Sequence, residues 1–129
     1  MDRQEAIDLI LDHYHHPRNR GALAAPTASG EGINPGCGDM VRMYIRMGDD
    51  GRIAAASFEG LGCTISQASA SIMTELALGK TFDDILAMDG ATMVETLGRE
   101  VVLSRTRCAT LPLDVLKQSI REFQGSMQA

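Results

Sequence analysis

Three cysteines and one aspartate are the residues of this sequence whose types and spacing could do chemistry. Cys37 and Asp39 share the segment "NPGCGD", Cys63 ends "GLGC", and Cys108 follows Arg107 in "TRC". An odd number of cysteines in a chain without a secretion signal argues against a disulfide framework and favours metal binding or thiol chemistry. A buried, inert thiol is a common role for one cysteine, but it is a weaker interpretation for three that all lie outside apolar helical stripes.

Three thiolates suit soft or borderline metal ions. A fourth ligand from Asp39 would complete a tetrahedral zinc site or the shell of an iron–sulfur cluster. One hard oxygen among sulfurs makes a weaker, more exchangeable bond, which suits a carrier better than a permanent structural site. The cysteine spacing is not that of a CxxC knuckle, so spacing alone is a weak signal for a metal site. The other interpretation of Asp39 is a turn carboxylate that caps backbone amides.

The reactivity of the thiols depends on where they sit. Cys63 and Cys108 precede predicted helices, whose positive N-terminal ends lower thiol pKa values, and Arg107 adds a cation beside Cys108. We therefore predict that both are prone to form thiolates. His13 and His16 are competing candidates for metal ligands, although their place in the last turn of a helix favours an interaction with the end of that helix.

The elements that must position these residues are read from periodicity. Ile7, Ile10, Leu11 and Tyr14 form an apolar stripe that predicts a helix from Arg3 to His15. The segment from Ala22 to Gly38 lacks any period and is predicted to be a long loop. An alternating pattern from Met40 to Met47, the turn "GDDGR" and the returning segment "IAAASFEG" predict an antiparallel hairpin.

The second half of the chain reads as helices. A capping box of Thr64 and Gln67 predicts a helix up to Gly79. The later predicted helices are Thr81 to Met88, Thr92 to Leu97, and a last helix with Pro112 in its first turn that runs to about Gln124, before a fraying tail, Gly125 to Ala129. The layout predicts an α+β fold, with a small antiparallel sheet packed on one face by helices.

Composition limits the classes of function. The chain has 129 residues, which is the size of one domain, and we treat residues 1–129 as a single one. A net charge of −5 argues against a nucleic-acid groove, which needs a basic face. The sequence contains neither an apolar run that would span a membrane nor a signal peptide, so we expect a cytoplasmic protein without a membrane partner.

Four segments carry a family likeness: "DHYHHPRNRG", "NPGCGD", "FEGLGCTISQASASIMTE" and "RTRCATLPLDVL". In this order and spacing the chain resembles the IscU/SufU (NifU N-terminal-like) iron–sulfur cluster assembly proteins along nearly its whole length. The resemblance implies a compact α+β fold with the three cysteines at one exposed end. It also implies that Cys37, Cys63 and Cys108 are the ligand cysteines, and that Asp39 is the aspartate that coordinates zinc and makes a bound cluster labile.

The two branches of the family differ at the third cysteine. IscU-type scaffolds have a histidine before it, within a segment of the form LPPVK then HC, whereas this chain has Arg107 there. The motifs "EGLGCTISQASAS" and "RCATL" are similar to SufU, yet the segment that SufU proteins insert between the second and third cysteines is absent. The length is closer to IscU and the motifs are closer to SufU.

The resemblance implies a scaffold or sulfur acceptor rather than a conventional enzyme. It would take persulfide sulfur from a cysteine desulfurase of the SufS or IscS type, and hold a transient [2Fe-2S] cluster, Zn²⁺ or Fe²⁺ for apo iron–sulfur proteins or carriers. The alternatives are a zinc-dependent sulfurtransferase that builds no cluster and a structural zinc domain. Cys37, in its glycine-rich loop, is the expected sulfur acceptor, with Cys108 as the alternative and Arg107 as a neighbouring cation.

Overall fold

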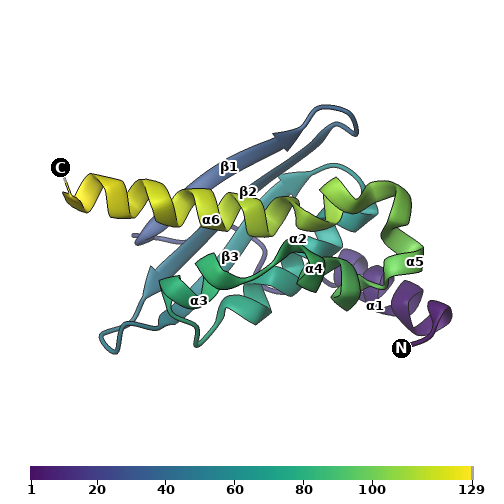
Figure 1. Ribbon diagram of the computed structural model, residues 1–129, viewed down its shortest axis with the longest axis horizontal. Coiled ribbons are helices and arrows are strands. Elements are labelled where there is room, and N and C mark those ends of the chain that lie inside the picture. The colour runs from purple at the N-terminus through teal and green to yellow at the C-terminus, as the bar shows by residue number, and fades with distance from the viewer. Residues whose placement is uncertain (129) are drawn as a thin grey trace.

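Three antiparallel strands, in the order β1-β2-β3, form the sheet of this protein. The computed structural model describes residues 1–128, and their elements follow one another as shown in Figure 1. The helices are α1 (Arg3–His15), α2 (Thr64–Ala77), α3 (Phe82–Ala87), α4 (Gly90–Leu97), α5 (Arg99–Val102) and α6 (Thr106–Gln128); the strands are β1 (Ala28–Asn34), β2 (Asp39–Met47) and β3 (Ile53–Leu61); a 3₁₀ turn, η1 (Leu103–Arg105), joins α5 to α6.

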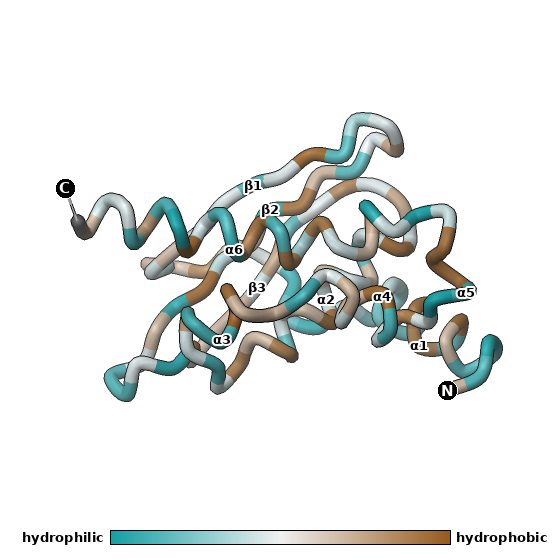
Figure 2. The backbone as a smooth tube through the Cα atoms, viewed as in Figure 1, coloured by the Kyte–Doolittle hydropathy of each residue, from teal (hydrophilic) through white to brown (hydrophobic). Residues whose placement is uncertain are grey.

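Helices α2 and α6 pack on one face of the sheet. The inward side chains of the strands, among them Met43, Ile45 and Phe58, are fully buried there, and brown apolar segments of the backbone trace line this interface (Figure 2). The predicted α+β fold and helix-covered sheet are therefore confirmed. On the opposite face the chain crosses from β3 towards β1. At the start of this crossing the Gly21 N–H donates to the Phe58 carbonyl, and at its end the Thr27 N–H donates to the Ile45 carbonyl. Between them the Ala24 carbonyl accepts from the Arg46 guanidinium.

Helix α1 has the predicted bounds but a different buried face. Asp2 and Glu5 form a capping box at its start. The buried residues are Ala6, Ile10 and His13, whereas Tyr14 of the predicted apolar stripe is 40% exposed. The buried set has helical spacing and includes Ile10 of the predicted stripe, so the period was correct, but the buried face is rotated and a histidine occupies a core position.

Strand β1 was predicted to be part of a loop. It pairs with β2 in the register Gly30↔Met43 and Gly32↔Val41. Its glycines face α6 so closely that an added Cβ would overlap Ser119 or Val115. Glycine is thus used for the approach of a strand to a helix, and because it carries no side chain it hides the alternating pattern that reveals other strands.

Three helix starts differ from their predictions. The N-cap of α2 is Cys63 rather than Thr64, since the Cys63 Sγ accepts the backbone N–H of Ser66 at 3.4 Å. Helix α6 begins at Thr106, so Pro112 lies inside the helix and not in its first turn. The predicted capping box of Thr81 and Asp84 on α3 is confirmed, and α4 starts two residues before its predicted range.

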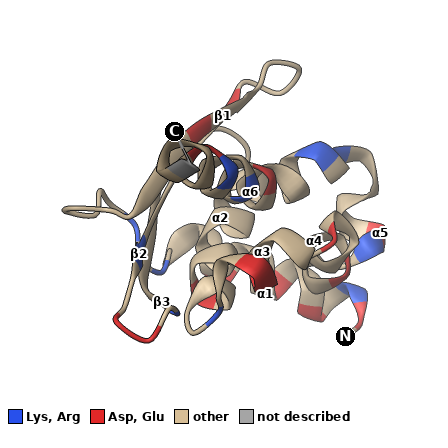
Figure 3. Ribbon diagram, turned by 60° about the vertical axis from the view of Figure 1, so that its left-hand side comes forward, with Lys and Arg blue, Asp and Glu red and all other residues tan. Residues whose placement is uncertain are grey.

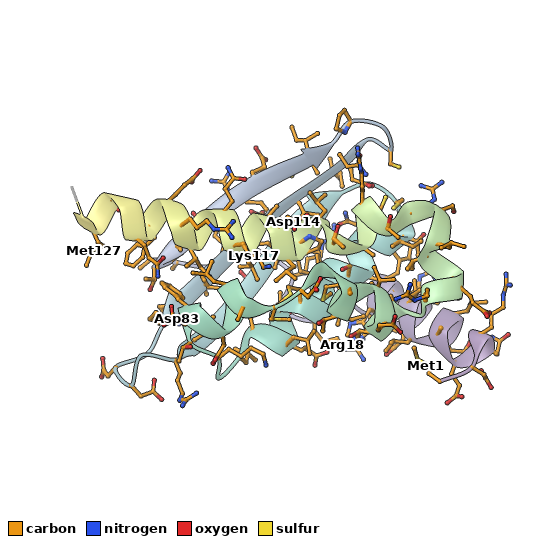
Figure 4. All side chains as sticks on the ribbon, in the orientation of Figure 1. Met1, Arg18, Asp83, Asp114, Lys117 and Met127 are labelled. Carbon is orange, nitrogen blue, oxygen red and sulfur yellow. The ribbon has the colours of Figure 1, made fainter. Side chains whose placement is uncertain are left out.

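Helix α6 spans much of the long axis. Met127, near its end, lies at the opposite end of the molecule from Met1, and Lys117 lies along its middle (Figure 4). The helix continues past the predicted end to Gln128, and Ala129 lies outside the described residues. Within residues 1–128, the helices all lack the combination of length and apolar character that a membrane crossing requires.

Candidate metal centre

Three segments that are far apart in the sequence meet at one end of the sheet (Figure 1). The turn between β1 and β2 carries Cys37, the connection from β3 to α2 carries Cys63, and the first turn of α6 carries Cys108. Antiparallel pairing sets this arrangement, because the pairs Asn34↔Asp39 and Met40↔Leu61 place the β1–β2 turn and the end of β3 at the same end of the sheet.

Cys37, Asp39 and Cys108 come together there. One potential ligand atom from each residue lies within 4.8 Å of the other two. Cys37 is exposed, whereas the Asp39 and Cys108 side chains are fully buried. The group therefore has one accessible thiol above a buried thiol and a buried carboxylate.

The Asp39 carboxylate is held by one of its two oxygens. Oδ1 accepts the backbone N–H of Cys63 at 2.8 Å and the Ser66 hydroxyl at 3.1 Å. Burial alone would raise the pKa of Asp39, but interactions with the nearby Cys108 thiol, the Cys63 amide and the Ser66 hydroxyl outweigh it, so this pKa lies below its usual value. The buried Oδ2 has no hydrogen-bond partner within residues 1–128, and an unpaired carboxylate oxygen beside thiols is a suitable donor for a zinc or iron ion.

Cys63 lies beside this group but outside its mutual 4.8 Å range. Its side chain is half-buried and caps α2 through the Ser66 amide. Its thiol is one of the groups that raise the pKa of Cys108, so the two sulfurs interact. The structure thus brings three of the four predicted ligands together, with the fourth as their neighbour.

Cys108 differs from the sequence-based prediction. Burial, followed by the interactions with Asp39, Cys37 and Cys63, raises its pKa far above the usual value, so the predicted tendency to form a thiolate is wrong for the metal-free site. Burial opposes the effect of a helix N-terminus because it destabilises the charged thiolate, and this sulfur is fully buried. The Asn34 amide donates to its sulfur at 3.5 Å. Metal binding at this position would release a proton.

The cation that faces the sulfurs is Arg105. Electrostatic interactions with Cys37 and then Cys63, followed by an interaction with Cys108, raise the pKa of its guanidinium. Arg105 and Arg107 both line the pocket of Cys37 and Cys108, and Figure 3 shows basic residues around the start of α6. The role predicted for Arg107 stays a prediction, and Arg105 was missed although its i, i+3 spacing to Cys108 was available as a signal.

The histidines are not part of this group. His13 is buried between α1 and α2, where its Nδ1 lies 2.8 Å from the Ser71 hydroxyl. Its Nε2 is 3.6 Å from a carboxylate oxygen of Glu75.

Sequence analysis also missed Ser66 and Asn34, because a serine in a helix and an asparagine before a proline carry no distinctive signal on their own.

Known proteins resemble this chain in sequence and fold. It is 32% identical to the iron–sulfur cluster assembly scaffold protein IscU of Escherichia coli strain K12 over 123 residues, which covers 93% of this chain and 94% of that protein. The crystal structure of a nitrogen-fixing NifU-like protein (N-terminal) from Brucella abortus has a TM-score of 0.76 at 25% identity, covering 93% of this chain and 98% of that one.

A third relative comes from the other branch. The crystal structure of a putative iron–sulfur cluster assembly scaffold protein for the SUF system from Fervidobacterium islandicum AW-1 has a TM-score of 0.72 at 26% identity, covering 88% of this chain and 94% of that one. The family described as NifU-like N terminal domain matches residues 5–129. This match, together with the IscU relative, shows that the chain belongs to the NifU-like N-terminal domain family.

Proposed function

We propose that this protein is an iron–sulfur cluster assembly scaffold. It accepts sulfur from a cysteine desulfurase and holds a nascent [2Fe-2S] cluster, or a metal ion, on Cys37, Asp39, Cys63 and Cys108 for transfer to apo-proteins. The observation that carries this proposal is the grouping of Cys37, Asp39 and Cys108 within 4.8 Å, with the buried Oδ2 of Asp39 unpaired among the described residues. The scaffold relatives support the same function.

A rotation of the Cys63 side chain would complete the set of ligands. Within residues 1–128 its sulfur accepts one long hydrogen bond, 3.4 Å from the Ser66 amide. A rotation of this half-buried side chain would exchange that bond for a metal. The two buried ligands would stay in place, while Cys37 and Cys63 adjust around the cargo.

Exposure favours Cys37 as the sulfur acceptor. A thiolate attacks the outer sulfur of a persulfide, so the rate depends on access as well as on ionisation. Cys37 is exposed in the turn between β1 and β2, whereas Cys108 is fully buried with a raised pKa. The Cys37 thiolate forms a new S–S bond to the terminal sulfur, the S–S bond of the partner's persulfide breaks, and the partner's cysteine leaves as a thiolate. Cys37 then carries the persulfide.

The second candidate function is zinc-dependent sulfur transfer without cluster assembly. It is supported by the SufU-like motifs "EGLGCTISQASAS" and "RCATL", and by Arg107, which stands where IscU-type scaffolds have a histidine. A purely structural zinc domain has less support. A large hydrophobic core lies between the sheet and its helices, and a fold with such a core does not depend on a metal to bury its apolar surface.

One experiment separates these functions. The protein is purified anaerobically, and its metal content and visible spectrum are recorded before and after iron, cysteine and a desulfurase are added. Sulfur-to-iron charge-transfer bands would support the scaffold. One bound zinc, no colour and faster desulfurase turnover would support the sulfurtransferase. Zinc that cannot be removed without unfolding the chain would support the structural domain and contradict both other functions.

A further inference from the structure

We propose that Ser66 is a positioning residue for the metal ligand Asp39. In this arrangement its hydroxyl helps to hold Oδ1 of the carboxylate, so that only Oδ2 is left for a metal. The inference rests on the proposed function, because it assigns a partner to one of the ligands named there. It identifies a residue of α2 that touches no metal but decides how one ligand is presented.

The contacts of Oδ1 come from the start of α2. The Cys63 N–H donates to it at 2.8 Å and the Ser66 hydroxyl at 3.1 Å. The side chains of Asp39 and Ser66 are both fully buried, so water does not compete for these bonds. Oδ2, in contrast, has no hydrogen-bond partner within residues 1–128. The carboxylate therefore has one satisfied oxygen and one free oxygen.

The Ser66 proton has two acceptors within reach. The Asp39 Oδ1 and the Cys63 carbonyl oxygen both lie 3.1 Å from its Oγ. A charged acceptor makes the stronger bond, so the proton points to the carboxylate. The Gln67 amide donates to the same Oγ at 3.1 Å, which occupies a lone pair and leaves the hydroxyl as a donor to Asp39.

The backbone of Gly62 restricts movement of the Asp39 carboxylate on the side of Oδ1. Its φ of +137° is one that side chains rarely adopt, and a Cβ there would overlap the Asp39 Oδ1 and lie 2.8 Å from the Asp39 Cα. The backbone thus packs directly against the held oxygen. With Oδ1 fixed between Gly62, Cys63 and Ser66, Asp39 can offer a metal one oxygen in one direction, which makes it a one-atom ligand.

The consequence is a carboxylate whose coordination is set before the metal arrives. Without the Ser66 hydroxyl, Oδ1 would lose one of its two bonds and the carboxylate would be free to turn or to bind through both oxygens. Loss of such an outer partner lowers metal affinity by roughly 10- to 100-fold in other metal sites. We expect a change at the lower end of that range, because the Cys63 N–H remains.

The test uses zinc and Co²⁺ on the full chain in buffer without added thiol. Zinc affinity is measured by competition with a chromogenic chelator for Ser66→Ala, for Ser66→Thr, which keeps the hydroxyl, and for Ser71→Ala, which removes another buried hydroxyl of α2 away from the site. Ser66→Ala should bind zinc about 10-fold more weakly than the unmodified protein, with a weakened tetrahedral Co²⁺ ligand-field band. Ser66→Thr and Ser71→Ala should keep affinity and spectrum.

A double-mutant cycle with Asp39→Ala shows whether Ser66 acts through Asp39. The effect of Ser66→Ala should fall to within about twofold in the Asp39→Ala background. If Asp39→Ala weakens zinc binding but Ser66→Ala does not, or if the Ser66 effect persists in that background, the inference is overturned and the proposed function stands. If the unmodified protein and Asp39→Ala bind zinc equally, or neither binds it, the proposed role of Asp39 fails and the inference fails with it.

Discussion

The backbone N–H of Cys63 donates to the Oδ1 of Asp39 at 2.8 Å. This bond joins the residue before α2 to the first residue of β2, which are 24 positions apart. A displacement of one segment is therefore passed to the other, and two candidate ligands are held in a fixed relation before any metal binds. The predictions below concern this joined site and the elements that support it.

Cys37→Ser should abolish persulfide labelling after reaction with a cysteine desulfurase, because Cys37 is the exposed thiol of the site. Cys108→Ser should retain most of the labelling, since the Cys108 sulfur is fully buried. Intact-mass spectrometry detects the added sulfur, and Cys63→Ser serves as a third comparison. Labelling that persists in Cys37→Ser and disappears in Cys108→Ser would assign the acceptor role to Cys108 instead.

Asp39→Ala should slow the loss of a reconstituted [2Fe-2S] cluster to a chelator in thiol-containing buffer. The carboxylate oxygen is the weakest of the proposed ligands, and in its absence a soft thiolate from the buffer can occupy the corner. The decay of visible absorbance gives the rate for the variant and the unmodified protein. An equal or faster loss from Asp39→Ala would show that the aspartate is not the labile corner.

Arg105→Gln should reduce the rate at which iodoacetamide alkylates Cys37 in the metal-free protein at neutral pH. Arg105 and Cys37 line the same pocket, and a cation near a thiol promotes the thiolate, which is the form that reacts with an alkylating agent. Because Arg105 is exposed, the change should be at most about fivefold and should shrink in high salt. Arg107→Gln is the matched control, since it removes the other arginine of the same pocket. Lys117→Gln, in the middle of α6, is the control for a distant positive charge (Figure 4). A larger effect of Arg107→Gln would restore the role first predicted for Arg107.

The stability of the metal-free protein should fall as the pH drops below the ordinary titration range of histidine. Burial, together with the charge of Arg18, lowers the pKa of His13, and Glu75 only partly opposes this. The unfolded chain then binds a proton at a pH where the folded protein does not, so protonation favours unfolding as the pH falls through about 6.5 and towards the lower folded value.

Urea unfolding at pH 7.5 and pH 5.5 measures this effect. His13→Gln should be less stable than the unmodified protein at pH 7.5 and should show a smaller difference between the two pH values. The exposed neighbour in the same helix gives the control variant, His15→Gln, which should keep the difference. If His13→Gln retains the full difference, the source of the pH dependence lies elsewhere.

The amino-acid sequence by itself determined the elements whose pattern is local. The bounds of α1, the hairpin of β2 and β3, and the capping box of α3 follow from apolar periodicity and turn residues, which act over a few neighbouring positions. The candidate ligands also came from the sequence, because their residue types and the four family motifs are visible in one dimension. Those features required no knowledge of which segments meet.

Only the tertiary structure decided the features that depend on contact between distant segments. Strand β1 exists because Gly30 and Gly32 allow it to lie against α6, and a glycine has no hydropathy pattern to announce this. The pKa of Cys108 is raised rather than lowered, since burial, followed by the interactions with Asp39, Cys37 and Cys63, outweighs its position at the start of a helix. The roles proposed for Arg105, for Ser66 and for Oδ2 of Asp39 also depend on the tertiary structure, because hydrogen bonds and charges act across space rather than along the chain.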